Sequence, residues 1–343
     1  MIQLTRVARE PMLGGSNHTR PPTHMSTLLG IHHITAMAGA PQGNIDFYTR
    51  VLGLRLVKRT VNFDDPYTYH FYFGNERGEP GTILTFFPWG ASSMRGRIGT
   101  GQVSVTAFSV PVGSINFWIE RLATHDVAFD GPESRFDQTL ISLRDYDGVA
   151  LELVESADDA RPGWSNGEIP EPHAIRGFHH ATLSLEDFER TAELLTTTMG
   201  FVRASESGNR VRFSAGDGAP GTIIDLVAEP DRARGSMGVG TVHHIAFRAA
   251  NDKEQLALRE RLVAAGADVT PVVDRQYFHS LYFLEPGGVL FEIATDPPGF
   301  LIDEAPDELG MHLKLPGWLE AQRAKIEARV APIKVPGSNR GAR

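Results

Sequence analysis

The sequence predicts an α+β protein made of four copies of one βαβββ unit, and the prediction depends on an internal repeat. Three segments begin alike, with a histidine pair in an alternating pattern: IHHIT at 31–35, FHHAT at 178–182 and VHHIA at 242–246. A fourth start, VSVTAF at 103–108, aligns with 242–247 but has no histidine. Self-similarity at a regular spacing indicates a repeated architecture. These starts divide residues 31–295 into four units.

Each unit has the same internal order, which is an alternating strand, an amphipathic helix and further strands that meet at glycine-rich turns. In the first unit we expect the helix at residues 44–52, ended by Gly53. In the fourth unit we expect it at residues 254–265, ended by Gly266.

The unit ends repeat as well. The matching pairs are GTILT at 81–85 with GTIID at 221–225, and GVALEL at 148–153 with GVLFEI at 288–293. Units one and three therefore resemble each other, as do units two and four. A duplicated pair of βαβββ units explains both similarities.

The units are expected to form two domains joined by a linker. The first domain covers residues 29–156 and the second 178–298, because residues 157–177 are rich in proline, glycine and charge, as boundary segments are. Residues 1–28 have no periodicity and no apolar core of a signal peptide, so we expect a disordered extension there. Residues 299–343 depart from the repeat and form a tail, with a helix expected at 320–329.

The composition limits the class of protein. The chain has 343 residues, of which 41% are hydrophobic, a formal net charge of −9 and no cysteine. Without cysteine, disulfides, thiolate nucleophiles and iron–sulfur clusters are excluded, and any metal must be held by His, Asp, Glu or the main chain. We expect no nucleic acid partner for an acidic chain, and no membrane span, because no apolar run approaches roughly 18–20 residues. The expected location is cytoplasmic.

Alternation along the strands decides which side chains can carry chemistry. Successive side chains point to opposite faces, so one histidine of each pair faces away from the apolar core. In the fourth unit, His244 alternates with large apolar residues, and Glu292 stands between two of them in the last strand. A carboxylate placed in this way on a half-buried strand needs a partner or a metal ion.

Two histidines and one carboxylate on the open face of curved sheets make a facial triad, which suits Fe(II) or Mn(II) and leaves positions for substrate and dioxygen. The fourth unit supplies His244 and Glu292, while the second histidine is open. It is His180 if the units pair within each half of the chain, and His33 if the first and fourth units pair across it. Units one and two have Val105 where unit four has His244, so they cannot form a site alone. Spacing along the chain favours His180.

Several segments together resemble a known family. They are LGIHHIT at 29–35, NIDFY at 44–48, VLGL at 51–54, DRQYF at 274–278, EPGG at 285–288 and FEIATDPPGF at 291–300. From residue 29 to the C-terminus the chain resembles the ring-cleaving dioxygenases of the vicinal oxygen chelate (glyoxalase/bleomycin resistance/extradiol dioxygenase) superfamily, in the branch that cleaves para-hydroquinones. The resemblance implies two glyoxalase-like domains, and residues 274–300 are its most specific part.

The resemblance also implies a ligand set. In this family the second histidine of the first His-His-Ile-Thr motif, the second histidine of the later pair and the late glutamate hold Fe(II), which corresponds to His33, His244 and Glu292. The implied residues around substrate and dioxygen are His32 and Thr35 for substrate binding, with His243, Tyr282 and Arg275 for catalysis. A homodimer is the expected assembly. One departure, the FHHAT start of unit three, keeps His180 as an alternative ligand.

The expected function is therefore an Fe(II)-dependent, extradiol-type dioxygenase that opens a hydroquinone or a related dihydroxylated aromatic ring with dioxygen. His243 and Tyr282 are expected as base and proton donor, and Arg275 as the group that holds anionic charge. Two alternatives keep the fold. One is a glyoxalase-like isomerase or lyase with Zn(II) or Ni(II), which usually has a second carboxylate where unit one has Thr85. The other is a non-enzymatic protein that sequesters an apolar compound.

Overall fold

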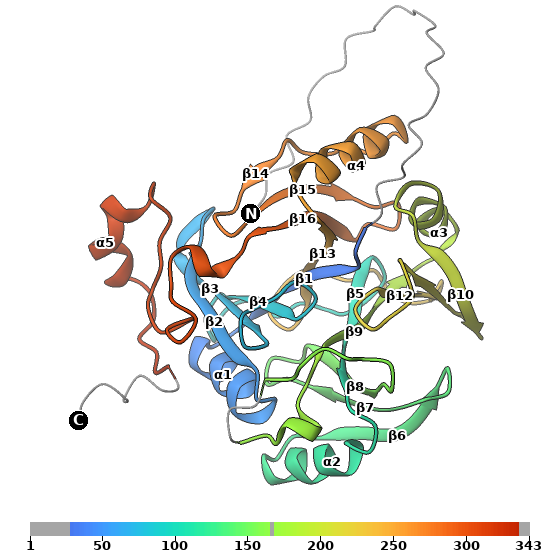
Figure 1. Cartoon of the computed structure of the whole chain (residues 1–343), viewed down its shortest axis with the longest axis horizontal. Helices are drawn as coiled ribbons and strands as arrows, with labels where there is room; N and C mark the ends of the chain where they lie inside the picture. Colours follow the sequence, from blue (N-terminus) through green and yellow to red (C-terminus); the bar gives the residue numbers. More distant parts are fainter. Residues whose placement is uncertain (1–27, 165–167, 336–343) are drawn as a thin grey trace, which may run out of the picture.

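The structure, a computed structural model, describes residues 28–164 and 168–335. Within these residues the strands form two curled eight-stranded sheets, and helices lie on their outer sides (Figure 1). The predicted α+β class and the four βαβββ units are confirmed. The expectation of a disordered extension covers residues 1–28, of which 1–27 lie outside the described residues, while Leu28 is buried in the core.

The first sheet combines the first and fourth units. Its strands, in spatial order, are β14 (Val273–Asp274), β15 (Phe278–Leu284), β16 (Leu290–Pro298), β13 (Val242–Ala249), β1 (Ile31–Ala38), β4 (Ile83–Pro88), β3 (Asp65–Gly74) and β2 (Arg55–Asn62). The two units join where β1 runs antiparallel to β13.

The second sheet combines the third and second units in the same way. Its strands, in spatial order, are β10 (Val202–Ser207), β11 (Arg210–Ser214), β12 (Ile223–Ala228), β9 (Gly177–Leu185), β5 (Gln102–Val110), β8 (Ala150–Glu155), β7 (Gln138–Arg144) and β6 (Phe129–Arg135). Here β5 runs antiparallel to β9.

The pairing of units corrects the expectation drawn from spacing along the chain. Each sheet takes four strands from the 29–156 segment and four from the 178–298 segment, so the units pair across the chain and not within each half. This pairing satisfies the strand edges. Within their own units, β1 and β13 each have one edge without a partner strand, and the two edges pair with each other, with Thr35 opposite His244. His33 and His244 therefore lie in the same sheet, and His180 lies in the other.

The helices differ from the predicted bounds at their starts. They are α1 (Pro41–Asp46) with the π-helical turn η1 (Phe47–Val51), α2 (Ile115–Thr124), α3 (Glu189–Glu193) with the π-helical turn η3 (Leu194–Thr198), α4 (Asp252–Ala264) and α5 (Arg323–Glu327). Three 3₁₀ turns complete the set, which are η2 (Glu171–His173), η4 (Phe300–Ile302) and η5 (Glu320–Gln322). The first helix begins early because proline fits the first helical position. The Asn251 side chain caps α4 by accepting a hydrogen bond from the Glu254 N–H.

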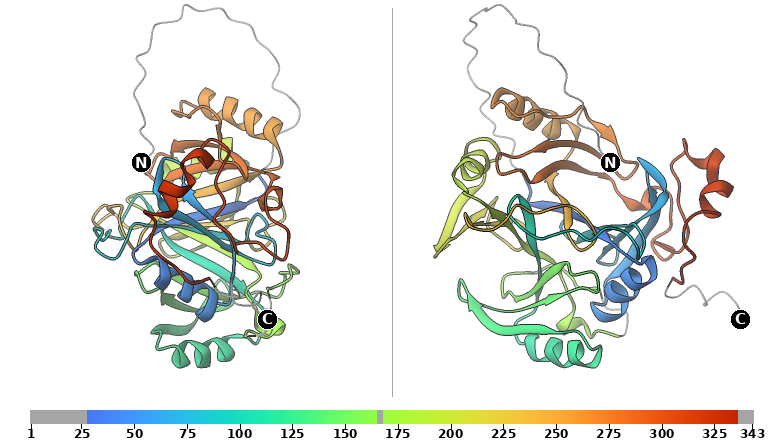
Figure 2. Two further views of the ribbon diagram at one scale, coloured as in Figure 1. Left: turned by 90° about the vertical axis from the view of Figure 1, so that its left-hand side faces the viewer. Right: turned by 180° about the vertical axis from the view of Figure 1, so that it is seen from behind.

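The hydrophobic core lies between the sheets and their outer helices. One face of β3 and β4 packs against η1, where Tyr48 contacts Phe73 and Phe86 at ring-centroid distances of 5.2 and 4.6 Å. Figure 2 shows α4 and α2 at opposite ends of the molecule, each on the outside of its sheet. The helices therefore take up the apolar faces of the sheets and leave the other faces for polar residues.

The tail after β16 runs along the edge of the first sheet. Leu313 forms a β-bridge with Arg59 of β2, and an apolar cluster joins Val61 to Leu319 and Ile326 of the tail. The helix expected at 320–329 is two residues shorter in the structure, where η5 and α5 together cover residues 320–327. The tail thereby covers the outer edge of the sheet that carries the histidine pairs of units one and four.

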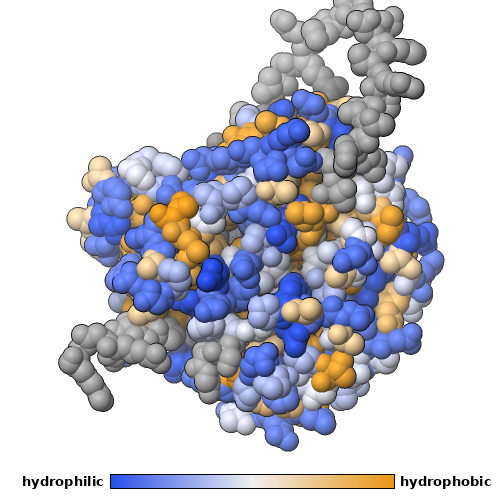
Figure 3. All heavy atoms as spheres, in the orientation of Figure 1, coloured by the Kyte–Doolittle hydropathy of each residue, from blue (hydrophilic) through white to orange (hydrophobic). Residues whose placement is uncertain are grey.

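The surface mixes residue types. In the view of Figure 3, hydrophobic residues appear in small groups among hydrophilic ones, as is usual for a folded chain in water. Every helix in the described part of the chain is too short or too polar to cross a lipid bilayer.

Candidate metal centre

Three buried side chains converge on the first sheet. They are His33 of β1, His244 of β13 and Glu292 of β16, with at most 5% of each residue exposed. His244 Nε2 lies 2.9 Å from Glu292 Oε2, His33 Nε2 lies 3.4 Å from the same oxygen, and the two imidazole nitrogens are 3.2 Å apart. Among the described residues, this is the group of His, Asp and Glu whose atoms are close enough to share one metal ion.

The sheet register explains why these residues meet. β16, β13 and β1 are neighbours at the centre of the sheet. Glu292 pairs with Ala246 across the parallel β13–β16 ladder, and His244 pairs with Thr35 across the antiparallel β1–β13 ladder. Because side chains alternate along each strand, His33, His244 and Glu292 all point to the same face.

The hydrogen bond on the far side of His33 determines which of its nitrogens carries a proton. His32 Nε2 lies 3.2 Å from the Thr295 carbonyl oxygen, which can only accept, so His32 donates from Nε2. Burial, together with His33, holds the pKa of His32 well below its usual value, so its Nδ1 is an acceptor. His33 Nδ1 lies 2.9 Å away and donates to it. The His33 Nε2 atom therefore presents a lone pair to the cluster, as a metal ligand must.

The charges of the cluster also suit a cation. Ser280 Oγ donates to Glu292 Oε1, while Glu292 Oε2 accepts no hydrogen bond. A buried, ionised oxygen without a donor is costly unless a cation satisfies it. This orphaned oxygen and the two imidazoles fit a divalent metal ion.

The cluster forms one wall of a cavity of about 470 Å³. The β2–β3 hairpin, represented by Phe63 and Asp64, forms part of its rim, and Phe87 and Phe278 are among its aromatic walls. The Phe278 ring lies 4.9 Å from the His33 ring. An opening of this size and aromatic lining accommodates a small planar ring next to the cluster.

The three residues predicted for catalysis line this cavity. Arg275 Nε donates to the Tyr282 hydroxyl oxygen at 3.2 Å, and Arg275 Nη1 lies 3.3 Å from Asp64 Oδ2. Burial and the Glu292 carboxylate raise the pKa of Tyr282 above its usual value, so its hydroxyl keeps its proton. Burial and His244 lower the pKa of His243 to about 3, so this ring is neutral near pH 7.

The two residues predicted to bind substrate do not line the cavity. His32 is buried behind His33 and bonds to the Thr295 carbonyl, as described above. Thr35 is fully buried, and its hydroxyl lies 2.8 Å from the Thr85 hydroxyl. His32 contacts the strand behind the cluster, whereas Thr35 lies on the same face as His33 and His244 and contacts Thr85, the partner of His70.

Sequence reasoning missed His70. It lines the cavity, its Nε2 lies 2.8 Å from Thr85 Oγ1, and its Nδ1 lies 2.9 Å from the Tyr72 hydroxyl oxygen. The residues around it are mostly aromatic, which is typical of a strand in the core. The alternation that placed His244 also places His70 and Tyr72 on the face opposite Phe71, which is in the core.

Fold and cluster together define a class, namely the metal-dependent enzymes built from paired βαβββ units with a His-His-Glu site on the open face of the sheet. The sequence matches the Glyoxalase/Bleomycin resistance protein/Dioxygenase superfamily over residues 30–153 and 177–293, and the chain belongs to this superfamily.

Individual relatives narrow the class. "Putative ring-cleaving dioxygenase MhqO" of Bacillus subtilis (strain 168) is 50% identical over 308 residues, which cover 90% of this chain and 97% of the relative. "Chlorohydroquinone/hydroquinone 1,2-dioxygenase" of Sphingobium indicum is 36% identical over 303 residues, covering 87% and 94%. The predicted family resemblance is confirmed, and the chain is an enzyme of the ring-cleaving dioxygenase group.

Solved structures agree with the fold. The crystal structure of a "putative dioxygenase" from Bacillus subtilis subsp. subtilis str. 168 superposes with a TM-score of 0.87 at 48% identity, covering 90% of this chain and 98% of that one. Glyoxalase I from Zea mays superposes with a TM-score of 0.58 at 16% identity, covering 78% and 92%, and so shares the fold alone.

Proposed function

We propose that the protein is an Fe(II)-dependent, extradiol-type dioxygenase that opens the ring of a hydroquinone or a related dihydroxylated aromatic compound. The observation that carries the proposal is the convergence of two imidazole nitrogens and an orphaned carboxylate oxygen at the wall of an aromatic cavity. The name of the Sphingobium relative supports a hydroquinone as substrate. In the overall reaction, one carbon–carbon bond beside a hydroxyl-bearing carbon breaks, and both oxygen atoms of dioxygen enter the product.

His33, His244 and Glu292 would hold the metal. Ferrous iron suits two imidazoles and one carboxylate on a single face, and it supplies a binding position for a phenolic oxygen and for dioxygen when it is bound. The position where a second carboxylate would favour the isomerase alternative is occupied by Thr85, whose hydroxyl bonds to Thr35 and His70. The donor set therefore favours the dioxygenase.

The cavity residues bind and orient the ring. Phe87 and Phe278 provide apolar surfaces against which a flat aromatic molecule can pack. Holding the ring at the cluster converts an encounter of separate molecules into a reaction within one complex. The cavity thus combines aromatic walls, which contact the flat face of the ring, with polar groups that can contact its oxygen atoms.

Three residues hold charge and protons around the ring. Arg275 donates to the Tyr282 oxygen, so the hydroxyl proton of Tyr282 stays free to pass to an oxygen of the substrate. The guanidinium of Arg275 stabilises negative charge that develops on the ring or its oxygen atoms. His243 Nδ1 lies 2.7 Å from His244 Nδ1. When His244 binds the metal through Nε2, its Nδ1 donates to His243, and the proton of neutral His243 is then on Nε2.

The test is oxygen uptake by protein reconstituted with a single metal. The protein is purified without oxygen, stripped of metal and loaded with Fe(II), Mn(II) or Zn(II), and oxygen consumption is followed with hydroquinone and with catechol. We expect uptake with Fe(II) and hydroquinone, together with a new absorbance of the ring-opened product. Glu292→Gln is expected to lose both bound iron and uptake, whereas Glu254→Gln on α4 serves as a matched control.

Other outcomes would refute the proposal. Tight binding of aromatics without oxygen uptake with any metal would favour the sequestering alternative. Turnover of a glutathione hemithioacetal with Zn(II) or Ni(II), without oxygen uptake, would favour the isomerase. The expected homodimer is checked separately by light scattering, because the reaction proposed here needs one chain.

A further inference from the structure

The second sheet carries a counterpart of the metal centre. The strand registers of the two sheets correspond, with Thr182 opposite Asp225 where the first sheet has Thr35 opposite Thr85. The corresponding positions are His180 for His33, Glu152 for Glu292, Val105 for His244, Asp225 for Thr85, Arg210 for His70 and Arg212 for Tyr72. Two buried carboxylates and one buried histidine therefore meet in the second sheet, away from the candidate metal centre.

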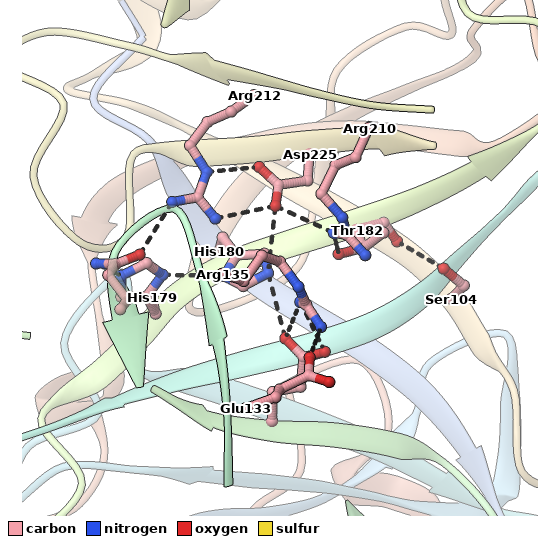
Figure 4. Close-up of polar contacts among 11 residues, drawn as sticks. Ser104, Glu133, Arg135, His179, His180, Thr182, Arg210, Arg212 and Asp225 are labelled. Atoms are coloured by element: carbon pink, nitrogen blue, oxygen red, sulfur yellow. Dashed lines mark hydrogen bonds and ion pairs between the residues drawn. The ribbon is translucent and has the colours of Figure 1, made fainter. Parts of the chain in front are cut away.

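A directed chain of hydrogen bonds leads into this cluster (Figure 4). Arg212 Nη1 donates to Gln138 Oε1 at 3.0 Å, so the amide nitrogen of Gln138 faces the other way. That nitrogen lies 2.8 Å from His179 Nε2. An amide nitrogen can only donate, so His179 Nε2 accepts, and burial holds the pKa of His179 at about 3, which keeps the ring neutral. The proton of His179 is therefore on Nδ1.

The same logic continues to His180. His179 Nδ1 lies 2.9 Å from His180 Nδ1 and donates to it. Burial, with a smaller contribution from His179, holds the pKa of His180 well below its usual value, so the neutral ring carries its single proton on Nε2. His180 Nε2 lies 3.5 Å from Glu152 Oε2 and 3.6 Å from Asp225 Oδ2. It thus presents an N–H between two carboxylates, where His33 presents a lone pair.

Arginines balance the charge of these carboxylates. Arg135 Nη1 lies 2.9 Å from both oxygens of Glu152, and Arg212 makes two hydrogen bonds to Asp225. Arg210 Nη1 lies 3.1 Å from Asp225 and 2.9 Å from the Thr182 hydroxyl. A divalent cation at this position would face three guanidinium groups, which like-charge repulsion disfavours.

We propose that Gln138, acting through His179, sets His180 as a hydrogen-bond donor and thereby keeps metal out of the second sheet. In the first sheet the Thr295 carbonyl takes the place of Gln138. It accepts a hydrogen bond from His32, so His33 has the tautomer opposite to that of His180. The acceptor at one far end and the donor at the other thus give the two second histidines opposite tautomers, and this difference acts together with the missing ligand at Val105 and the three arginines. Gln138 is a positioning residue here, and the comparison with His33 rests on the function proposed above.

The experiment reads the tautomers directly in metal-free protein. Long-range ¹H–¹⁵N correlation spectra of ¹⁵N-histidine-labelled protein distinguish rings protonated at Nδ1 from rings protonated at Nε2, and His179→Gln and His180→Gln assign the signals. In the wild type we expect His179 protonated at Nδ1 and His180 at Nε2. An unprotonated His180 Nε2 would overturn the proposal without any reference to activity.

A substitution tests the role of Gln138. Gln138→Glu replaces the amide donor by an acceptor, so we expect the proton of His179 to move to Nε2, with a corresponding change at His180 Nδ1. Gln322→Glu, an exposed residue of η5, is the matched control and is expected to change neither ring. If the His179 proton stays on Nδ1 in Gln138→Glu, Gln138 does not control the pair.

Metal counting by mass spectrometry completes the test. We expect one metal ion per chain in the wild type and in His180→Gln. Two metal ions per chain in the wild type, with one of them lost in His180→Gln, would overturn the exclusion of metal. Loss of the ion in His33→Gln is the separate test of the proposed ligands. Retention of the ion in that variant would refute the ligand assignment and leave the tautomers of His179 and His180 as measured.

Discussion

Lys58 connects the wall of the cavity to the tail. Replacing it measures how much this connection contributes to the free energy of unfolding. Its side chain is fully buried, and its ammonium lies 2.5 Å from both Asp303 Oδ1 and Glu304 Oε2. It also donates to the Phe300 carbonyl at 3.2 Å. Phe300 in turn packs against Tyr72, with ring centroids 5.0 Å apart, and the Tyr72 hydroxyl is hydrogen-bonded to the cavity residue His70.

The magnitude follows from the burial of the partners. In Lys58→Met, the Glu304 carboxylate, whose side chain is 1% exposed, loses its cation and keeps two long N–H contacts of 3.3 and 3.4 Å. Asp303 is 20% exposed and still accepts from the Tyr277 hydroxyl, so its loss is smaller. Removing one partner of a buried ion pair costs about 3–5 kcal/mol, and we expect a loss of this size in the free energy of unfolding.

Urea denaturation followed by circular dichroism measures this loss. Lys253→Met on the exposed side of α4 is the matched control and is expected to stay within about 0.5 kcal/mol of the wild type. The double variant Lys58→Met/Glu304→Gln removes the unpaired charge, so it is expected to recover at least half of the loss. A single variant that loses less than about 1 kcal/mol, or a double variant as unstable as the single one, would refute the reasoning.

Three further predictions concern the site and its surroundings. Tyr282→Phe removes the proton donor but no proposed ligand, so bound iron is expected to stay and kcat to fall about 100-fold; an unchanged kcat would exclude Tyr282 as donor. His70→Leu breaks the Tyr72–His70–Thr85 hydrogen bonds, and we expect kcat/KM to fall about tenfold at constant iron content, whereas a loss of iron would instead make His70 part of the metal site. Burial raises the pKa of Asp145 to about 6 in the folded protein, above its unfolded value, so this carboxyl costs stability as pH rises from about 4 to 6. Urea denaturation at pH 4 and pH 7 gives the difference in free energy of unfolding between Asp145→Asn and the wild type. We expect this difference to favour the variant by about 2–3 kcal/mol more at pH 7 than at pH 4. An equal difference at both pH values would contradict the raised pKa.

Much of the site could be predicted because strand alternation is a local property. His244 and Glu292 each alternate with apolar residues, which is enough to place both on the polar face of their strands. The same rule applied to β3 would have placed His70 on that face. It was not found because a single histidine within a run of aromatic residues gives a weaker pattern than a repeated pair.

The choice between His33 and His180 could not be made in this way. Both stand second in a histidine pair, both are followed by an alternating strand, and both are buried. One difference is the partner at the far end of each pair, the Thr295 carbonyl in one sheet and the Gln138 amide in the other. These partners are 263 and 41 residues away along the chain, so no local pattern contains them.

The sequence by itself determined the repeated βαβββ unit, the faces of its strands and the kind of side chain available for a metal, because each depends on periodicity within a few residues. The tertiary structure decided that the first unit pairs with the fourth, which brings His33 within 3.4 Å of Glu292 and leaves His180 among arginines. The physical reason is that strand pairing and the direction of buried hydrogen bonds are set by groups distant in sequence, and those groups meet only in the folded chain.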